Sequence, residues 1–125
     1  RSKHGFEQTV QMVRDNALRV GWDVPWDFEL QQHYRERGLS DMTKVVNVYL
    51  CNPQGGYDIM KGDVYKPMAV MMPTAVSVYE TSDGEVHVSR MNLGRMALMF
   101  RGTVRETLRS GGANLDKALE GVVEG

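Results

Sequence analysis

Cys51 is the only cysteine of the chain, and it ends the apolar run "VVNVYL" at 45–50. Asn52 and Pro53 follow at once, and proline suits the first turn of a helix. A thiolate at such a strand-to-helix turn can have a lowered pKa, but nucleophilic work also needs a base, normally histidine. The three histidines come from different segments: His4, His33 and His87. A free cysteine usually behaves as a small buried hydrophobe, so the sequence favours a buried or ligand-facing thiol.

A second stretch whose residues could take part in binding or chemistry is Met72-Pro73-Thr74, inside the apolar run at 68–80. Proline within a strand removes a ladder donor and predicts a bulge, which can direct side chains into a cleft. Thr74 could then donate a hydrogen bond to a ligand. The alternative is a kinked edge strand that resists aggregation.

Metal and cofactor chemistry is weakly supported. Nine methionines are many for 125 residues, and a haem pocket, a copper site or an adaptable binding surface would each use them. Methionine at helical or strand spacing is usually core, which is the interpretation we favour. No CxxCH motif and no histidine pair at helical spacing occur, so we predict no metal and no cofactor. The "NPQGG" stretch at 52–56 lacks the lysine of a phosphate loop and favours a plain turn over a backbone anion site.

Composition sets the class of protein. The 125 residues suit one domain, and we predict a single domain over 1–125. A net charge of -1 argues against a nucleic-acid or anionic-membrane binder. No apolar run approaches the roughly 20 residues that span a bilayer. The chain starts at Arg1, from which we expect that a preceding segment was removed. Localisation is therefore open: cytoplasmic, or periplasmic if a signal or anchor segment preceded Arg1.

The first half of the chain predicts alternating helices and strands. Apolar spacing predicts a helix over 6–20 closed by Gly21, and "WDVPW" at 22–26 fits a short edge strand. We then expect a polar helix over roughly 28–37, capped by Asp27, and a strand over 44–51 covered on both faces. A helix over 53–62 should place Tyr57 and Met60 on its inner side.

The second half predicts a hairpin followed by helices. A long strand over 68–80, with Pro73 in its middle, should turn at Asp83-Gly84 into a partner strand over 85–92. A helix over 93–108 should break at "RSGG", and Asn114 should cap a final helix. The fold class is therefore α+β, with a mixed, largely antiparallel sheet and helices packed on one face.

Several short motifs occur together in this order: "GFEQTV" at 5–10, "GWDV" at 21–24, "LCNP" at 50–53, "MMP" at 71–73, "VYE" at 78–80 and "DGEVHVSRMN" at 83–92. Together they resemble the domain of unknown function 302 (DUF302) family over nearly the whole chain. The resemblance implies a small α+β domain, often dimeric, in mainly bacterial and archaeal proteins, and some relatives carry a hydrophobic N-terminal segment. It implies no activity. Relatives often read Met-Pro-Cys where this chain has Thr74, so a two-thiol mechanism within one chain is excluded.

These observations favour a non-catalytic, homodimeric domain that binds a small ligand or a partner between its sheet and its helices. The candidate ligand-binding residues are those of the two stretches described above, with two secondary candidates, Tyr57 and Met91; the six primary ones are Cys51, Asn52, Pro53, Met72, Pro73 and Thr74. Catalytic residues are not predicted, and an enzyme is the less favoured class. One alternative is a thiol-dependent redox protein or enzyme that uses Cys51. Another is an interaction module anchored at a membrane, although the domain itself would not span it.

Overall fold

An amphipathic helix, α1 (Phe6–Arg19), opens the fold in the computed structural model, which describes residues 1–124. Its buried face includes Val13 and Ala17, as the apolar spacing predicts. Gly21 follows with a positive φ of 87°, a conformation that glycine adopts without the steric cost of a Cβ. The predicted helix and its glycine end are confirmed.

Four strands form one sheet: β1 (Asp23–Glu29), β2 (Val45–Cys51), β3 (Thr74–Glu80) and β4 (Val86–Arg90). Their order in the sheet is β1-β2-β3-β4, and each pair of neighbours is antiparallel. The α+β class is confirmed, and in the described part of the chain the sheet is antiparallel throughout. β1 is longer than predicted because Pro25 lies on an edge strand, where the missing N–H removes no ladder bond that the sheet needs.

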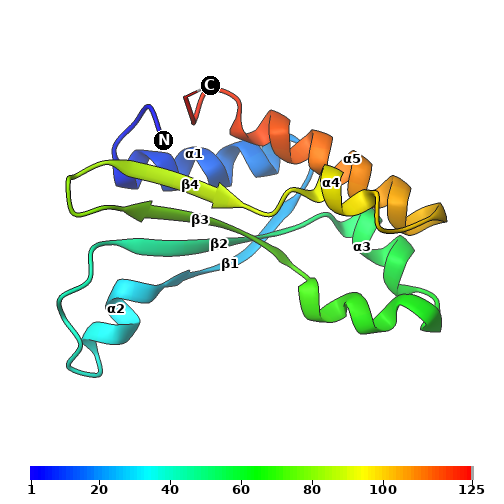
Figure 1. Ribbon diagram of the computed structural model, residues 1–125, viewed down its shortest axis with the longest axis horizontal. Helices are drawn as coiled ribbons and strands as arrows, with labels where there is room; N and C mark the ends of the chain where they lie inside the picture. The colour runs from blue at the N-terminus through cyan, green and yellow to red at the C-terminus, as the bar shows by residue number, and fades with distance from the viewer. Residues whose placement is uncertain (125) are drawn as a thin grey trace.

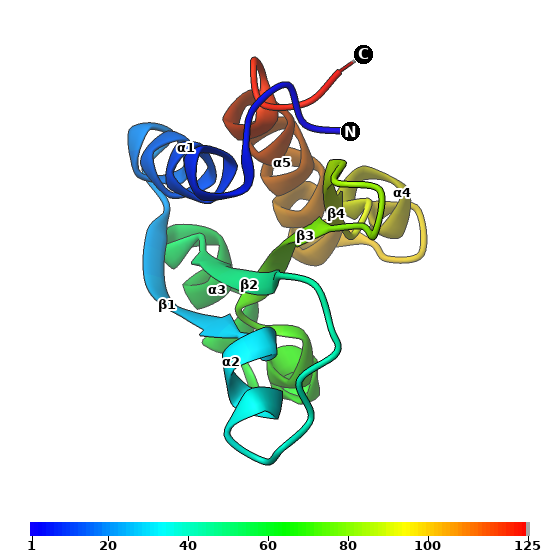
Figure 2. The same ribbon diagram turned by 90° about the vertical axis from the view of Figure 1, so that its left-hand side faces the viewer.

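One face of the sheet is covered by α1 and α5 (Gly102–Leu119), which lie side by side above it (Figures 1 and 2). On that face Val46, Val48 and Leu50 of β2 are buried, together with Val76 and Val78 of β3. These valines and leucines meet the inner faces of the two helices in a single apolar core.

The opposite face carries no fully buried side chain, and we call it the open sheet face. Cross-strand register places twelve residues on it: Asp23, Trp26, Phe28, Val45, Asn47, Tyr49, Cys51, Ala75, Ser77, Tyr79, His87 and Ser89. The prediction that the strand at 44–51 is covered on both faces was therefore wrong. Apolar residues on both faces mark two-sided burial only if a second layer exists, and here that layer is incomplete within residues 1–124.

Helix α2 (Leu30–Arg35) is shorter than the predicted helix at 28–37. Its cap position is Glu29, which makes no side-chain capping bond. Asp27 is not a cap, because it lies on β1 and its carboxylate pairs with Arg14 of α1. The ion pair with the covering helix explains why an acidic residue sits on the core side of an edge strand.

Helix α3 (Pro53–Met60) confirms the prediction that a helix begins at Pro53. Asn52 is its cap, and the side chain accepts a hydrogen bond from the Gly55 N–H at 3.3 Å. The inner face was predicted correctly at Met60, which packs against the core, and wrongly at Tyr57, which is 65% exposed; Ile59 is the fully buried residue. The helix turns Gly55 and Ile59 toward α5, which leaves Tyr57 in solvent.

Residues 63–71 differ most from the prediction. They form a 3₁₀ helix, η1 (Asp63–Met71), where a linker and the first half of a strand were expected. The peptide between Met72 and Pro73 is cis, and β3 starts only at Thr74. Pro73 therefore precedes the strand instead of interrupting it, so no bulge within β3 is needed to accommodate it.

The hairpin is confirmed, with Gly84 at a φ of 85° in the turn between β3 and β4. The helical third is divided differently from the prediction. α4 (Leu93–Ala97) ends first, Gly102 has a φ of 63° at the start of α5, and α5 runs unbroken through Gly111 and Gly112. Asn114 lies inside α5 and caps nothing.

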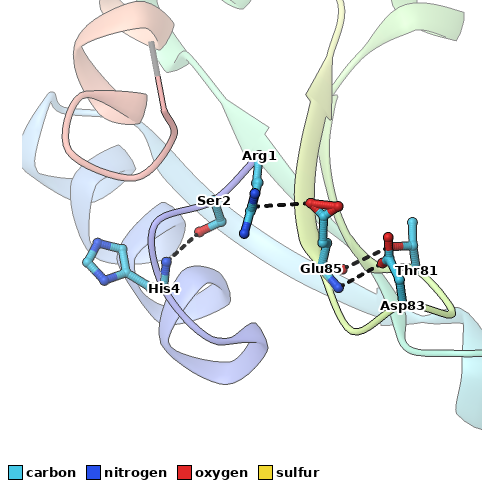
Figure 3. A network of polar contacts seen from close by, with 6 residues as sticks. All are labelled: Arg1, Ser2, His4, Thr81, Asp83 and Glu85. Carbon is cyan, nitrogen blue, oxygen red and sulfur yellow. Dashed lines mark hydrogen bonds and ion pairs between the residues drawn. The ribbon is translucent and has the colours of Figure 1, made fainter.

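The two ends of the chain lie together beside β4 (Figure 1). The Ser2 N–H donates to the Val86 carbonyl at 2.7 Å, and Ser2 also bridges to Val123. Arg1 pairs with Glu85 at 3.2 Å, next to the hairpin turn held by Asp83 (Figure 3). These contacts fasten the N-terminal segment along the β4 edge. None of the helices in residues 1–124 has the length and apolar character needed to cross a membrane.

Candidate functional site

A cavity of about 90 Å³ lies where β2 ends and β3 begins, between the sheet and the helices. We call it the Cys51 cavity. Its walls come from the ends of β2 and β3, from α3, η1, α4 and α5, and from the loop before β1. The lining residues are Trp22, Leu50, Cys51, Asn52, Gly56, Ile59, Met68, Met71, Met72, Pro73, Thr74, Leu93, Thr107, Leu108 and Gly111.

Antiparallel pairing explains why two distant stretches of sequence meet here. Leu50 of β2 is the register partner of Thr74 of β3, so the residues just after β2 adjoin those just before β3. The stretch that begins at Cys51 and the stretch at Met72–Thr74 therefore line one cavity. Five of the eight predicted ligand-binding residues line it: Cys51, Asn52, Met72, Pro73 and Thr74.

The other three predicted residues lie outside the cavity lining. Pro53 is exposed in the first turn of α3, and Tyr57 is on the solvent side of the same helix. Met91 is 43% exposed in the connection between β4 and α4. Closeness in sequence to cavity residues wrongly predicted that Pro53 and Tyr57 line the cavity, because a helix directs successive side chains to different faces.

Sequence reasoning missed several lining residues, of which Trp22 is the most informative. Trp22 precedes β1 and is 4% exposed, and its ring edge lies against Gly111 of α5. Gly111 was assigned to a helix break. A paired glycine inside a continuous amphipathic pattern would have been the signal, because a missing Cβ allows another element to approach a helix closely.

Two residues that line this cavity each carry a buried polar atom with no hydrogen-bond partner among the described residues. These atoms are the indole Nε1 of Trp22 and the hydroxyl Oγ1 of Thr74. An unsatisfied buried donor costs about 1–3 kcal/mol, and most such groups in folded proteins find a partner. Two such residues in the lining of one cavity make it the candidate functional site.

Cys51 lies opposite Asp23 in the β1–β2 register. Burial raises the pKa of the Cys51 thiol, and the nearby Asp23 carboxylate raises that pKa further. Both effects oppose the thiolate, so the side chain is a neutral thiol at pH 7. The helix start at Pro53 does not reverse this, which removes the physical argument for an activated nucleophile.

The wall formed by α3 depends on a close approach to α5. A Cβ built on Gly55 would lie 2.8 Å from Cγ2 of Thr107 and 2.6 Å from Nδ2 of Asn52. Only glycine fits there without displacing the cap or the neighbouring helix. The "NPQGG" turn therefore has a packing role, in which Gly55 seats α3 on α5 and fixes one wall of the cavity.

Sulfur is the main potential metal ligand at the site. Four sulfur-containing side chains line the cavity: Cys51, Met68, Met71 and Met72. Within residues 1–124 no group of three or more histidine, cysteine, aspartate or glutamate side chains could hold a metal ion. Thiol and thioether groups suit soft ions such as Cu(I), and they also form an adaptable apolar lining.

Comparison with known proteins identifies a family and a crystal structure with the same fold. A family model described as "Domain of unknown function DUF302" matches residues 1–122. A crystal structure from Bacillus stearothermophilus, described as an uncharacterized conserved protein DUF302, superposes with a TM-score of 0.80 at 18% sequence identity. The match covers 98% of this chain and 94% of that chain, and it shows a shared fold. Among curated proteins no sequence matches.

Proposed function

This chain belongs to the DUF302 family, whose description names no activity, and we propose that it binds a small molecule in the Cys51 cavity without transforming it. The single observation that carries the proposal is the pair of unpartnered polar atoms, Nε1 of Trp22 and Oγ1 of Thr74, on residues that line one cavity. A largely apolar pocket with a few polar groups is the usual form of a small-molecule site.

The composition of the lining supports binding over catalysis. Of the described residues that line the cavity, none is histidine, aspartate, glutamate, lysine or arginine. The described lining therefore offers Cys51 no base, and burial together with the Asp23 carboxylate outside the lining raises the pKa and keeps the thiol protonated. A thiol-dependent reaction would need both an activated thiolate and a proton acceptor. The alternative of an enzyme using Cys51 is accordingly the weaker proposal.

A homodimer is the second part of the proposal, and the open sheet face supports it. Trp26 is 51% exposed on that face and stacks on Tyr49 with ring centroids 4.9 Å apart. Tyr79 stacks on His87 at 5.4 Å on the same face. Apart from Asp23 beside Cys51, its residues include no aspartate, glutamate, lysine or arginine, so two copies could face each other with little repulsion between like charges. The membrane-anchored interaction module stays a prediction.

Methionine methyl groups provide a direct test of binding in the Cys51 cavity. The protein is labelled with ¹³C at the methionine methyl groups and titrated with xenon, an apolar probe that enters dry cavities. We expect shifts concentrated at Met68, Met71 and Met72, which line the cavity. Leucine variants of each methionine assign the signals.

The other methionines serve as controls in the same spectrum. Met12, Met42 and Met99 lie outside the lining and should not respond. Uniform shifts across all methionines would indicate surface binding, and an unresponsive Met68, Met71 and Met72 would mean that the cavity is closed. Either outcome would contradict the proposed function.

A further inference from the structure

The charge of the cavity lining restricts what can bind there. No described lining residue carries a formal charge, and Cys51 is a neutral thiol. Burying an ion without a counter-charge costs far more than burying a neutral polar group. The cavity therefore selects a neutral ligand over a carboxylate or a phosphate.

The unpartnered atoms restrict the ligand further. An indole N–H is a donor only, so Trp22 requires an acceptor on the ligand. The Thr74 hydroxyl can also donate, and both residues line the same cavity. An oxygen with two lone pairs, such as a carbonyl oxygen, could accept from either or both donors. The rest of the lining is chiefly aliphatic carbon and sulfur, which suits a short apolar chain.

The size of the cavity sets the scale of the ligand. About 90 Å³ is less than the roughly 150 Å³ of an engineered cavity that binds benzene, so a group of about five heavy atoms fits. Met71, at 36% exposure, lies at the rim, and flexible methionines can adapt to the ligand's shape.

Resting on the proposed binding function, we propose that the Cys51 cavity takes a small neutral molecule whose carbonyl-type oxygen accepts hydrogen bonds from the Trp22 indole and the Thr74 hydroxyl. The same chemistry would serve the carbonyl end of a larger neutral molecule whose remainder leaves past Met71. No covalent step is involved. Cys51 contributes contact area, and the two donors determine orientation.

Two pairs of probes with matched shapes test this ligand class. Butanone and 2-methyl-1-butene differ by an oxygen in place of a methylene, and propionamide and propionate differ in charge. Dissociation constants come from the shifts of the Met68, Met71 and Met72 methyl signals. In wild type we expect propionamide to bind and propionate not to bind.

Variants separate the hydrogen bonds from the fit of the apolar part. Thr74→Val removes the hydroxyl with little change of volume, and Trp22→Phe removes the indole N–H. Each should raise the ratio of the butanone to the 2-methyl-1-butene dissociation constant by roughly 2- to 12-fold, the range expected for one neutral hydrogen bond. Thr74→Ser should retain the wild-type ratio. Thr103→Val is the matched control, because Thr103 is exposed on α5 outside the lining.

The outcomes distinguish this inference from the function on which it rests. An unchanged ratio in both Thr74→Val and Trp22→Phe, or equal binding of propionate, would overturn the carbonyl-ligand inference. A response to Ag⁺ that is lost in Cys51→Ala, with no response to butanone, would also overturn it and would assign the sulfur groups to a soft metal ion. Failure of xenon, butanone and Ag⁺ alike would reject binding in this cavity altogether.

Discussion

At the scale of single residues, the protonation of Cys51 decides which chemistry the cavity can support. The thiol lies at the junction of β2 and α3, where a helix start alone would favour the thiolate. Burial and the Asp23 carboxylate act in the opposite direction, and the pKa of Cys51 is raised. Desolvation is the larger of the two causes, so the neutral thiol follows from where the strand places the side chain.

We therefore predict a specific pH dependence of stability. The folded-state pKa of Cys51 is above its unfolded value, so folding opposes ionisation. The contribution of Cys51 to the free energy of unfolding should be constant below the ordinary thiol pKa of about 8.5. It should decrease as the pH rises from that value to the raised one. Urea unfolding of wild type and Cys51→Ala from pH 7 to about 10 isolates this slope, because other titrating groups are common to both.

Labelling kinetics give the complementary readout for the same thiol. Alkylation by iodoacetamide should have a midpoint above the ordinary thiol pKa and should accelerate on unfolding. A midpoint below that value, with rapid labelling of the folded protein, would contradict a buried neutral thiol. It would make the thiol-dependent enzyme the favoured function.

At the scale of elements, the contact between α4 and α5 determines the shape of the cavity. Gly111 and Gly112 lie in the middle of α5, where glycine lowers helix propensity. Gly112 approaches the backbone of Gly94 in α4, and Gly111 faces Trp22 and Leu93. The close approach of the two helices is a tertiary reason for glycine at two positions that local preferences alone would assign to a loop.

Alanine substitutions at these two neighbours should have opposite effects on stability. A Cβ at Gly111 would lie 3.6 Å from Leu93 Cδ1 and 3.8 Å from Trp22 Cζ2, which are ordinary contacts. Gly111→Ala should therefore stabilise the protein by about 0.5–1 kcal/mol through helix propensity. A Cβ at Gly112 would lie 2.9 Å from the Gly94 backbone nitrogen, so Gly112→Ala should destabilise by about 1–3 kcal/mol.

Urea unfolding of both variants measures these differences. Gly111 lines the Cys51 cavity, so the methyl group that alanine introduces there should take up cavity space. Gly111→Ala should therefore weaken xenon and butanone binding in spite of its greater stability. Equal destabilisation by the two substitutions would contradict the assigned packing. Unchanged xenon binding in Gly111→Ala would show that the probe occupies another site.

At the scale of the whole molecule, the sheet separates two surfaces with different roles. The helix-covered side holds the apolar core. The Cys51 cavity is lined in part by α3, η1 and α5, and α3 packs against both of the others. Figure 1 shows these elements near the end of β2. The open sheet face is on the other side and carries two stacked aromatic pairs. The four stacked residues lie outside the cavity lining, so different substitutions can alter ligand binding and self-association.

We predict that a charge on the open sheet face disrupts the proposed dimer. Trp26→Glu removes the exposed ring that stacks on Tyr49 and places two like charges across a symmetric interface. Sedimentation velocity should show a dimer for wild type and a monomer for the variant. The Met68, Met71 and Met72 response to xenon should be unchanged.

A control on the far side of the molecule makes the result specific. Leu18→Glu alters an exposed position of α1, with 57% of the residue accessible, and should remain dimeric. A wild type that sediments as a monomer at all concentrations would reject the dimer. A Trp26→Glu variant that stays dimeric would place the interface elsewhere.

Local pattern determined much of the fold from the sequence alone. The first helix, the strand at 45–51, the helix start at Pro53 and the hairpin at Asp83-Gly84 all follow from spacing, capping and turn chemistry. These signals depend on neighbours within a few residues, so the chain specifies them before any tertiary contact forms. The sequence also indicated that Cys51 and Met72–Thr74 belong to one cleft, and they line one cavity.

Only the tertiary structure decided the helix boundaries around the glycines, the helix at 63–71 and the full cavity lining, because these features depend on which surfaces meet. Gly111 and Gly112 resemble a helix break until α4 packs against them. Residues 68–71 belong to η1 although their apolar side chains suit a strand. Trp22 became a cavity residue through contacts with α5 that no local pattern records. The unpartnered Trp22 and Thr74 donors, which carry the functional proposal, appear only when every buried polar atom can be matched with its surroundings.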